Sequence, residues 1–308
     1  MDQIIGDQKD TFGRSLSAWA DRHRKWIFIS PALGFIALLV VGPLAWTILL
    51  GFTDASGSVR SQFSFIGLDN YVSIFLDTSR FWPSISRTFA FAATSVSFEL
   101  VLGMSVALLL RKTFRGQASV RLVILLPLVT TPVVVGLMWM LILDPNIGFL
   151  NQVMSWIGLP GQSWLSDPHT ALATLAFINI WEWTPMAALI LLAGLTSLPD
   201  EPNEAAEMDG ASAIQRFRYV TLPLMRPTIV TVVVLSGLEA MKAFDIILVA
   251  KGPGGGSAHE AETLNIYAYA LNFTYNDYGM ASAVVIIFVL ILLSLFSLTL
   301  IKRRSASK

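Results

Sequence analysis

The sequence contains no cysteine, which excludes disulfide bonds and metal sites built on thiolates. Its three histidines, His23, His169 and His259, lie far apart without the spacing of metal ligands. We therefore expect them to be surface or interfacial residues, and we expect no metal site. Charged residues make up only 14% of the chain, against about 25% in soluble domains. Because the formal net charge is zero, the overall charge does not indicate a nucleic acid partner.

Apolar residues take the place of the missing charge. They make up 54% of the 308 residues, and the mean hydropathy is +0.64, which indicates a membrane protein. We assign residues 26–304 to a single transmembrane domain and residues 305–308 to a C-terminal tail. Residues 1–25 form a cytoplasmic N-terminal segment, in which FGRSLSAWADRHRK is either an interfacial helix or a solvated basic tail.

Six segments are apolar enough to cross a bilayer core, which requires about 20 mostly apolar residues per helix. Three contain no charged residue: 26–53, 122–143 and 278–301. Three others contain a few: 85–110, 171–195 and 228–250. The sequence therefore predicts an all-α membrane protein with six transmembrane helices. Prolines predict kinks at Pro43, Pro127, Pro132 and Pro185.

Most of the 21 lysine and arginine residues fall on one side of this arrangement. They lie before the first helix, between the second and third, between the fourth and fifth, and after the sixth. Cytoplasmic loops are enriched in these residues. We therefore expect both termini, and the loop between helices four and five, to be cytoplasmic.

The loop between helices four and five is charged and helix-forming; from Asn203 it reads NEAAEMDGASAIQRFRYVTLPLMRP. Asp200 and Asn203 are good N-cap residues for a first helix, and Gly210 stands where a helix would end through a left-handed residue. Ser212 can cap a second helix, which we expect to stop near Pro223. The loop is predicted to be two short helices joined by a tight turn.

Small side chains at Ala205 and Ala206 would let a partner approach the first helix, and Glu204 would offer it a carboxylate. An ordinary helical loop would show the same features. A motif favours the first interpretation: the spacing E-A-A, three residues, G, nine residues, an aliphatic residue, one residue, L-P resembles the signature loop of permease subunits in binding-protein-dependent ABC importers. The matching residues are Glu204, Ala205, Ala206, Gly210, Val220, Leu222 and Pro223, with Val220 in place of the commoner isoleucine.

Two further stretches resemble the sugar-type branch of this family. Asp209, Gly210 and Ala211 give the DGA that looks like that branch. AFDIILVAKGPGGG, followed by ETLNIYAYALNFTYNDYGMASA, is similar to a segment of maltose-type permeases in which Phe-Asp precedes a Gly-Gly-Pro loop, Y-x-Y and G-x-A-S-A. This chain has KGPGGG where that family usually has a threonine before Gly-Gly-Pro. The resemblance covers residues 26–304.

The resemblance implies a transport subunit rather than an enzyme. It implies that the chain forms the translocation pathway of an ATP-driven importer for a carbohydrate or related polyhydroxylated solute. It also implies a multi-pass protein of a bacterial cytoplasmic (inner) membrane. The chain itself would bind no cofactor: GPGGGS lacks the G-K-[ST] ending of a phosphate-binding loop. ATP and Mg would be bound by two partner ATPase subunits. The other implied partners are a second permease subunit in a heterodimer, a soluble substrate-binding protein and membrane lipid. The residues implied in ATPase coupling are Glu204, Ala205, Ala206, Asp209, Gly210, Ala211, Leu222 and Pro223.

Three other functions share some of these features. An ABC importer for another substrate class, such as peptides or phosphonates, shares the loop motif, although Phe244-Asp245 and the Gly-Pro loop favour sugars. A secondary transporter usually has about twice as many helices or an internal repeat, and the sequence has neither. An intramembrane enzyme is disfavoured because no nucleophile and base pair or metal cluster is apparent.

Polar side chains inside the predicted helices are candidates for the substrate pathway, because they are costly in a membrane. Helix four places Asn179, Glu182, Trp183 and Met186 at i, i+3, i+4 and i+7. This face combines an amide, a carboxylate and an aromatic ring, which suits a polyhydroxylated ligand.

Helix five carries Glu239, Lys242 and Asp245 at intervals of three residues. These residues either contact substrate or form a structural ladder of ion pairs. Glu99 in helix two is expected to be a helix-packing partner. An alternative for the whole set is that only the second permease subunit contacts the substrate.

Overall fold

The structure is a computed structural model that describes residues 25–26, 28–57 and 63–306. The predicted N-terminal segment 1–25 therefore lies almost entirely outside the described residues. In the described part every regular element is helical, and the only β contacts there are two isolated bridges, Thr53–Phe65 and Ser56–Asp277. The prediction of an all-α protein is confirmed.

Four helices of the described part are long and apolar enough to cross a membrane. They are Phe28–Leu50, α4 (Phe81–Arg111), α8 (Ala171–Thr196) and Tyr278–Ser297, which belongs to α15 (Tyr278–Ala306). They correspond to the first, second, fourth and sixth predicted spans. Because α15 continues to Ala306, the helix enters the predicted C-terminal tail.

The first span contains the kink signal at Pro43. A π-helical turn, η1 (Ala37–Val41), precedes α2 (Gly42–Leu50), and Pro43 lies in the first turn of α2. The helix continues from η1 into α2 without a break, and the π turn directly before Pro43 changes the local hydrogen bonding where a proline would otherwise disrupt it. No residue in the most apolar stretch of this span is buried by the rest of the described chain. Its side chains are therefore available to lipid or to a partner.

The third predicted span is two helices, α5 (Gln117–Val129) and α6 (Pro132–Ile142), bent by 101°. Proline disfavours the helical conformation of the residue before it. Accordingly Thr131 is extended, with φ −71° and ψ 142°, and Thr130 is extended as well. The pair passes as a span only when both helices are counted as one broken crossing, so the kink predicted at Pro132 is found as a sharp break directly before that residue.

The fifth predicted span is also interrupted. It consists of α12 (Arg226–Met241) and α13 (Asp245–Lys251), separated at Lys242–Phe244. Asp245 is the first residue of α13, where a carboxylate is favoured by the helix dipole. In the described residues the structure therefore gives four spanning helices, or five with the bent pair, rather than six uninterrupted ones.

The core of the molecule is built by α4, α8 and α12, which pack against one another. Small residues allow close approach: a Cβ added to Gly103 of α4 would lie 3.0 Å from the Cβ of Ala187 in α8. A Cβ added to Gly194 of α8 would lie 2.6 Å from Thr228 of α12. Larger side chains at either glycine would therefore force these helices apart.

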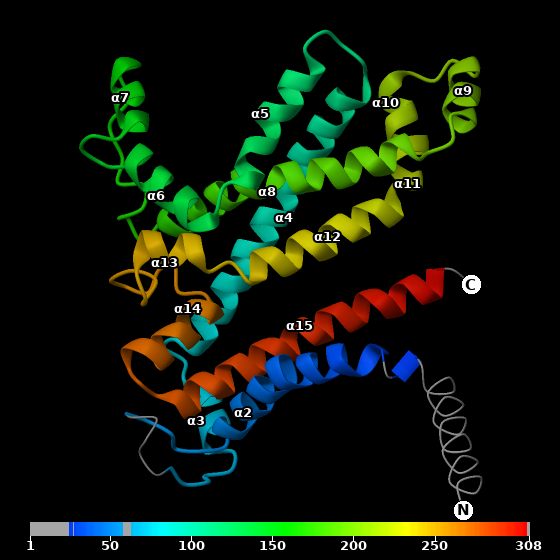
Figure 1. The fold of residues 1–308 in the computed structure, drawn as a ribbon. Coiled ribbons are helices and arrows are strands. Elements are labelled where there is room, and N and C mark those ends of the chain that lie inside the picture. The colour runs from blue at the N-terminus through cyan, green and yellow to red at the C-terminus, as the bar shows by residue number, and fades with distance from the viewer. Residues whose placement is uncertain (1–24, 27, 58–62, 307–308) are drawn as a thin grey trace, which may run out of the picture.

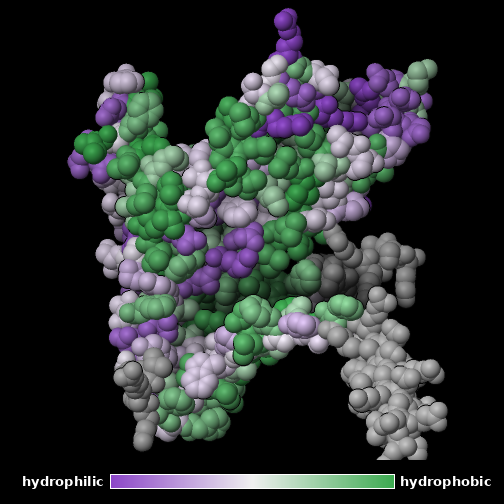
Figure 2. Space-filling view, viewed as in Figure 1, coloured by the Kyte–Doolittle hydropathy of each residue, from purple (hydrophilic) through white to green (hydrophobic). Residues whose placement is uncertain are grey.

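The remaining helices are short and gather at the ends of the bundle. They are α3 (Asp69–Leu76), α7 (Phe149–Trp156), α9 (Glu201–Met208), α10 (Ala213–Arg216), η2 (Phe217–Thr221), α11 (Leu222–Leu224), α14 (Leu264–Tyr269) and η3 (Ala270–Thr274). Figure 1 shows α9 and α10 projecting at one end of α8 and α12, with α13 and α14 at the opposite end. α15 packs against α2, α3 and α14. Figure 2 shows hydrophilic surface over α9 and α10 and a hydrophobic surface over much of the helices between the two ends.

Candidate functional site

The loop between α8 and α12, residues 197–225, is called the projecting loop below. It forms the helix, turn and helix that its sequence predicts. Gly210, after α9, has φ +80°, so the predicted left-handed glycine is confirmed. Ser212 caps α10 in both directions: its backbone N–H donates to Gln215 Oε1 at 2.7 Å, and its Oγ accepts from the Gln215 N–H at 3.3 Å. The predicted cap at Ser212 is confirmed. Asp200 is the N-cap of α9 by position, but its side chain makes no capping hydrogen bond.

The expected stop near Pro223 is found one residue later. The helical run that begins at Ala213 continues through the π turn η2 into α11 and ends at Leu224. Met225 forms a turn, and α12 begins at Arg226. The π turn directly before Leu222 changes the local hydrogen bonding, so the chain passes Pro223 itself without a break.

Three contacts hold the projecting loop to the bundle and hold its two helices together. Glu207 of α9 forms an ion pair with Arg216 of α10 across the turn. The Thr221 hydroxyl of η2 donates to Asn203 Oδ1 of α9 at 3.3 Å. Arg111, at the end of α4, lies 3.5 Å from the Asp200 carboxylate. The loop is thus anchored to α4, and α9 is held to both α10 and η2.

The predicted coupling residues occupy two levels of this loop. Glu204, Ala205, Asp209 and Gly210 are exposed, Ala206 and Ala211 are half-buried, and Leu222 and Pro223 lie at the base. Two large apolar side chains stand beside them, with Met208 88% exposed and Ile214 79% exposed. Met208 is not predicted by the sequence motif as a contact residue. The sequence signal for it is an apolar residue directly before an Asp-Gly turn in a hydrophilic loop.

A pocket of about 400 Å³ lies between α8 and α12, and we call it the α8–α12 pocket. Trp183 and Met186 of α8 face Glu239 and Lys242 of α12 across it. Lys242 Nζ donates to Glu239 Oε1 at 2.7 Å, and both side chains keep access to solvent. The structure therefore brings together two of the four predicted residues of helix four and two of the three predicted residues of helix five. Hydrophilic surface is visible near the junction of α12 and α13 in Figure 2.

The other helix-four candidates lie behind the wall of this pocket. Asn179 and Glu182 are buried, with 2% and 3% of their surface exposed. Asn179 Nδ2 donates to Glu99 Oε1 of α4 at 3.1 Å, and Ser236 of α12 lies beside the same carboxyl group. Glu99 is a helix-packing partner, as predicted, and through Ser236 it also supports the α8–α12 pocket.

Asp245 is separated from Glu239 and Lys242 by the interruption between α12 and α13. Its carboxylate is exposed and lies close enough to Glu182 for electrostatic repulsion. Among the described ion pairs, only the one between Glu239 and Lys242 forms within this set. The predicted ladder of three charges is therefore reduced to one pair, because the helix does not continue through Ala243.

Comparison with known proteins identifies the family. The family described as "Binding-protein-dependent transport system inner membrane component" matches residues 99–307, about two thirds of the chain. The chain belongs to this family. The match includes α8, the projecting loop, α12 and α15, so both candidate sites lie within the family domain.

Relatives within the family are named as sugar permeases. The trehalose/maltose transport system permease protein MalF of Thermococcus litoralis is 32% identical over 268 residues, which covers 87% of this chain and 89% of that protein. The trehalose transport system permease protein SugA of Mycobacterium tuberculosis is 30% identical over 273 residues, covering 89% and 86%. The resemblance to sugar-type ABC permeases is confirmed.

Solved structures show the same fold. A bacterial ABC transporter involved in the import of the acidic polysaccharide alginate contains a chain with a TM-score of 0.81 and 23% identity, covering 95% of this chain and all of that one. The alginate transporter in complex with an alginate pentasaccharide-bound periplasmic protein gives the same TM-score over 94% of this chain and 98% of that one. At this level of identity the two structures show a shared fold.

Proposed function

We propose that this chain is the transmembrane permease subunit of an ATP-driven ABC importer for a carbohydrate or related polyhydroxylated solute. The observation that carries the substrate class is the α8–α12 pocket, where Trp183 lies near the Glu239–Lys242 ion pair. An aromatic ring packs against the C–H face of a sugar, and charged groups form strong hydrogen bonds with hydroxyl groups. The names of the relatives, trehalose and maltose permeases, support this assignment.

In the proposed arrangement the chain crosses the membrane six times. The bent pair α5–α6 forms the third crossing and the interrupted pair α12–α13 forms the fifth. Both termini and the projecting loop lie in the cytoplasm, and α13 and α14 lie toward the opposite side. Interrupted helices are tolerated at membrane depth where they line a cavity. The pocket beside the interruption in α12–α13 fits that requirement.

The projecting loop is the proposed docking site of an ATPase subunit. Its anchoring to α4 and η2 would transmit a movement of the ATPase to the bundle as a lever. Met208 and Ile214 offer exposed apolar contacts, and Glu204 offers a carboxylate. In this arrangement two ATPase subunits bind ATP and Mg, a second permease subunit forms a heterodimer with this chain, and a soluble binding protein delivers the substrate.

The test is transport in proteoliposomes that contain this chain, the second permease, the ATPase subunits and the binding protein. We expect ATP-dependent uptake of radiolabelled trehalose or maltose. Trp183→Ala should raise the transport KM roughly tenfold, because losing a ring contact of about 1.4 kcal/mol corresponds to one decade of affinity. Trp156→Ala is the control, since that ring is 75% exposed on α7 and outside the pocket.

Three results would contradict the proposal in different ways. Uptake without ATP would indicate a secondary transporter. Uptake of peptides or phosphonates in place of sugars would support the alternative substrate class. Sugar uptake with a KM that Trp183→Ala leaves unchanged would place the substrate contacts in the second permease subunit.

A further inference from the structure

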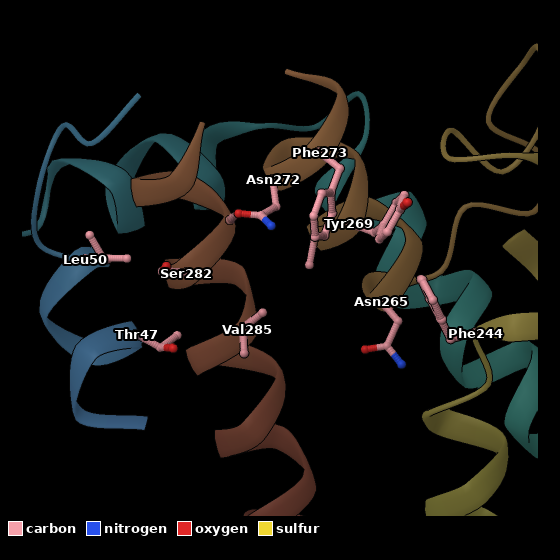
Figure 3. A pocket seen from close by; sticks show the side chains of 11 residues that line it. Thr47, Leu50, Phe244, Asn265, Tyr269, Asn272, Phe273, Ser282 and Val285 are labelled. Atoms are coloured by element: carbon pink, nitrogen blue, oxygen red, sulfur yellow. The ribbon is translucent and has the colours of Figure 1, made fainter. Parts of the chain in front are cut away.

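A second pocket, of about 510 Å³, lies between α2, α14, η3 and α15, and we call it the α14–α15 pocket. Three aromatic rings follow one another along its wall. The ring centroid of Tyr269 lies 5.2 Å from that of Phe244 and 4.6 Å from that of Phe273. Figure 3 shows these rings and Asn265 on one side of the space, with Val285 reaching in from α15 on the other.

The polar groups of this pocket are neutral hydrogen-bonding groups. Asn265 and Asn272 contribute amides and Ser282 contributes a hydroxyl, and among the described residues no Asp, Glu, Lys, Arg or His lines the pocket. Asn265 uses one N–H to donate to the Lys242 carbonyl at 2.9 Å, which leaves its carbonyl oxygen and its second N–H for a ligand. A charged ligand would find no counterion here, so the lining suits a neutral ligand with many hydroxyl groups.

Both the size and the composition of the pocket fit a small saccharide. Ligand pockets of about 300–1,000 Å³ are typical, with mostly apolar walls and a few placed polar groups. The rings of Tyr269 and Phe273 present flat apolar surfaces, and Phe273 is 65% exposed. The half-buried amide of Asn272 belongs to the same helical segment, one residue before Phe273, so that ring and hydrogen-bonding group are offered side by side.

The two pockets adjoin where α12 is interrupted. Lys242 lines the α8–α12 pocket with its side chain and holds Asn265 of the α14–α15 pocket through its backbone carbonyl. Phe244, two residues later, lines the α14–α15 pocket. The interruption of the helix therefore places one wall of each pocket within three residues of chain.

We propose that the α14–α15 pocket is an outer subsite for a neutral sugar ring, from which the substrate passes to the α8–α12 pocket. This inference rests on the proposed function. The α14–α15 pocket lies at the beginning of the last span, at the end of the molecule away from the projecting loop. In the proposed orientation, that is the side from which an importer receives its substrate. Phe244, Tyr269 and Phe273 contact the ring face, and Asn265 and Asn272 bind the hydroxyl groups.

The first experiment measures binding in the assembled transporter with trehalose and maltose as probes. Because the chain has no native cysteine, Val285→Cys places a single thiol in the α14–α15 pocket. We expect an impermeant thiol reagent to label it from outside, and millimolar trehalose or maltose to slow labelling roughly tenfold. Ser257→Cys, an exposed position outside the pocket, is the control whose labelling the sugars should not change.

The second experiment separates a binding role from a structural one. Tyr269→Ala should raise the transport KM roughly tenfold, by the loss of about 1.4 kcal/mol of ring contact, at an unchanged yield of complex. Tyr269→Phe, which keeps the ring, should stay within about threefold of wild type. Two results would overturn the outer subsite alone, provided that the wild-type complex shows normal uptake. The first is an unchanged transport KM in Tyr269→Ala, and the second is labelling of Val285→Cys that neither sugar slows.

Two other outcomes have distinct meanings. A thiol at Val285→Cys that no reagent reaches, together with a lower yield of the Tyr269→Ala complex, would show that the second permease subunit fills the α14–α15 pocket, which also overturns the proposal. If the wild-type complex imports no saccharide at all, the proposed function itself fails, and the outer subsite fails with it.

Discussion

Asn179 donates a hydrogen bond from Nδ2 to Oε1 of Glu99 at 3.1 Å, and both side chains are almost completely buried between α8 and α4. Ser236 of α12 lies beside the same carboxyl group. One side chain of α4 therefore meets the other two core helices at a single point. Since Ser236 lines the α8–α12 pocket, this point also fixes part of the pocket wall.

Glu99→Ala should destabilise the assembled complex. The substitution leaves the buried Asn179 donor without a partner, which costs about 1–3 kcal/mol, and opens a cavity in addition. Glu99→Gln keeps an acceptor oxygen and the side-chain shape, so its effect should be smaller. The measurement is the apparent Tm of the purified complex in detergent. Equal Tm values for wild type and Glu99→Ala would show that the hydrogen bonds of Glu99 do not hold the helices.

The sequence predicted the projecting loop closely because its signals are local. The left-handed Gly210 and the cap at Ser212 each depend on a few neighbouring residues, and each is found in the structure. The stop near Pro223 is found one residue later, at Leu224, because a π turn upstream lets the chain pass the proline. The approximate positions of four spans were also predictable, since each is a long apolar stretch.

The broken helices and the pockets were less accessible to sequence reasoning. A hydropathy window averages about 20 residues and does not register a single extended residue such as Thr131, although Pro132 carried the signal. The Glu99–Asn179 hydrogen bond joins residues 80 positions apart, and no local pattern specifies it. The same holds for the α14–α15 pocket, where Val285 faces rings from η3 and its neighbours only through tertiary packing.

The orientation of the chain predicts opposite accessibilities for two serines. Ser212 lies in the projecting loop and Ser257 in the glycine-rich segment after α13, and both are exposed. We expect Ser257→Cys to react with a membrane-impermeant maleimide on intact cells, and Ser212→Cys to react only after the membrane is permeabilised. Labelling of Ser212→Cys but not of Ser257→Cys on intact cells would reverse the proposed topology.

Disruption of the projecting loop should release the ATPase subunits while leaving the membrane bundle intact. Gly210→Pro cannot adopt the observed φ of +80°, because the proline ring fixes φ near −65°. Glu204→Lys reverses an exposed charge of α9. Each variant should retain less ATPase during affinity purification and lose transport in proportion.

The matched control for this charge reversal is Asp69→Lys, an exposed acid at the start of α3 that lies far from the projecting loop. It should keep the wild-type amount of ATPase. If Gly210→Pro and Glu204→Lys also keep full ATPase content and the wild-type transport rate, the ATPase docks elsewhere.

The glycine-rich segment after α13 is held by a buried ion pair. Lys251 and Glu260 pair with side chains that are only 7% and 5% exposed, and Lys251 Nζ also donates to the Leu165 carbonyl at 2.7 Å. Burial alone would raise the pKa of Glu260, but hydrogen bonds from Lys251 and from the Ala258 N–H outweigh it and hold that pKa below its ordinary value of 4.5. The carboxylate therefore stabilises the folded state.

Acid should weaken this segment in the wild type but not in Glu260→Gln. A lowered folded-state pKa gives stability that is fully present above the unfolded value of 4.5 and is lost as the pH falls through the folded value. Breaking the buried pair should cost about 3–5 kcal/mol at neutral pH, because Lys251 is left buried without its counterion. The measurement is thermal unfolding of the complex, followed by tryptophan fluorescence between about pH 7 and about pH 3. Glu260→Gln should have the lower Tm at neutral pH.

The Tm values of the wild type and of Glu260→Gln should then converge as the pH falls below 4.5. His259 and Glu262 lie 3.4 Å apart in the same segment and are present in both proteins, so the difference between the two curves isolates Glu260. Parallel curves over the whole range would show that the Lys251–Glu260 pair does not stabilise the segment.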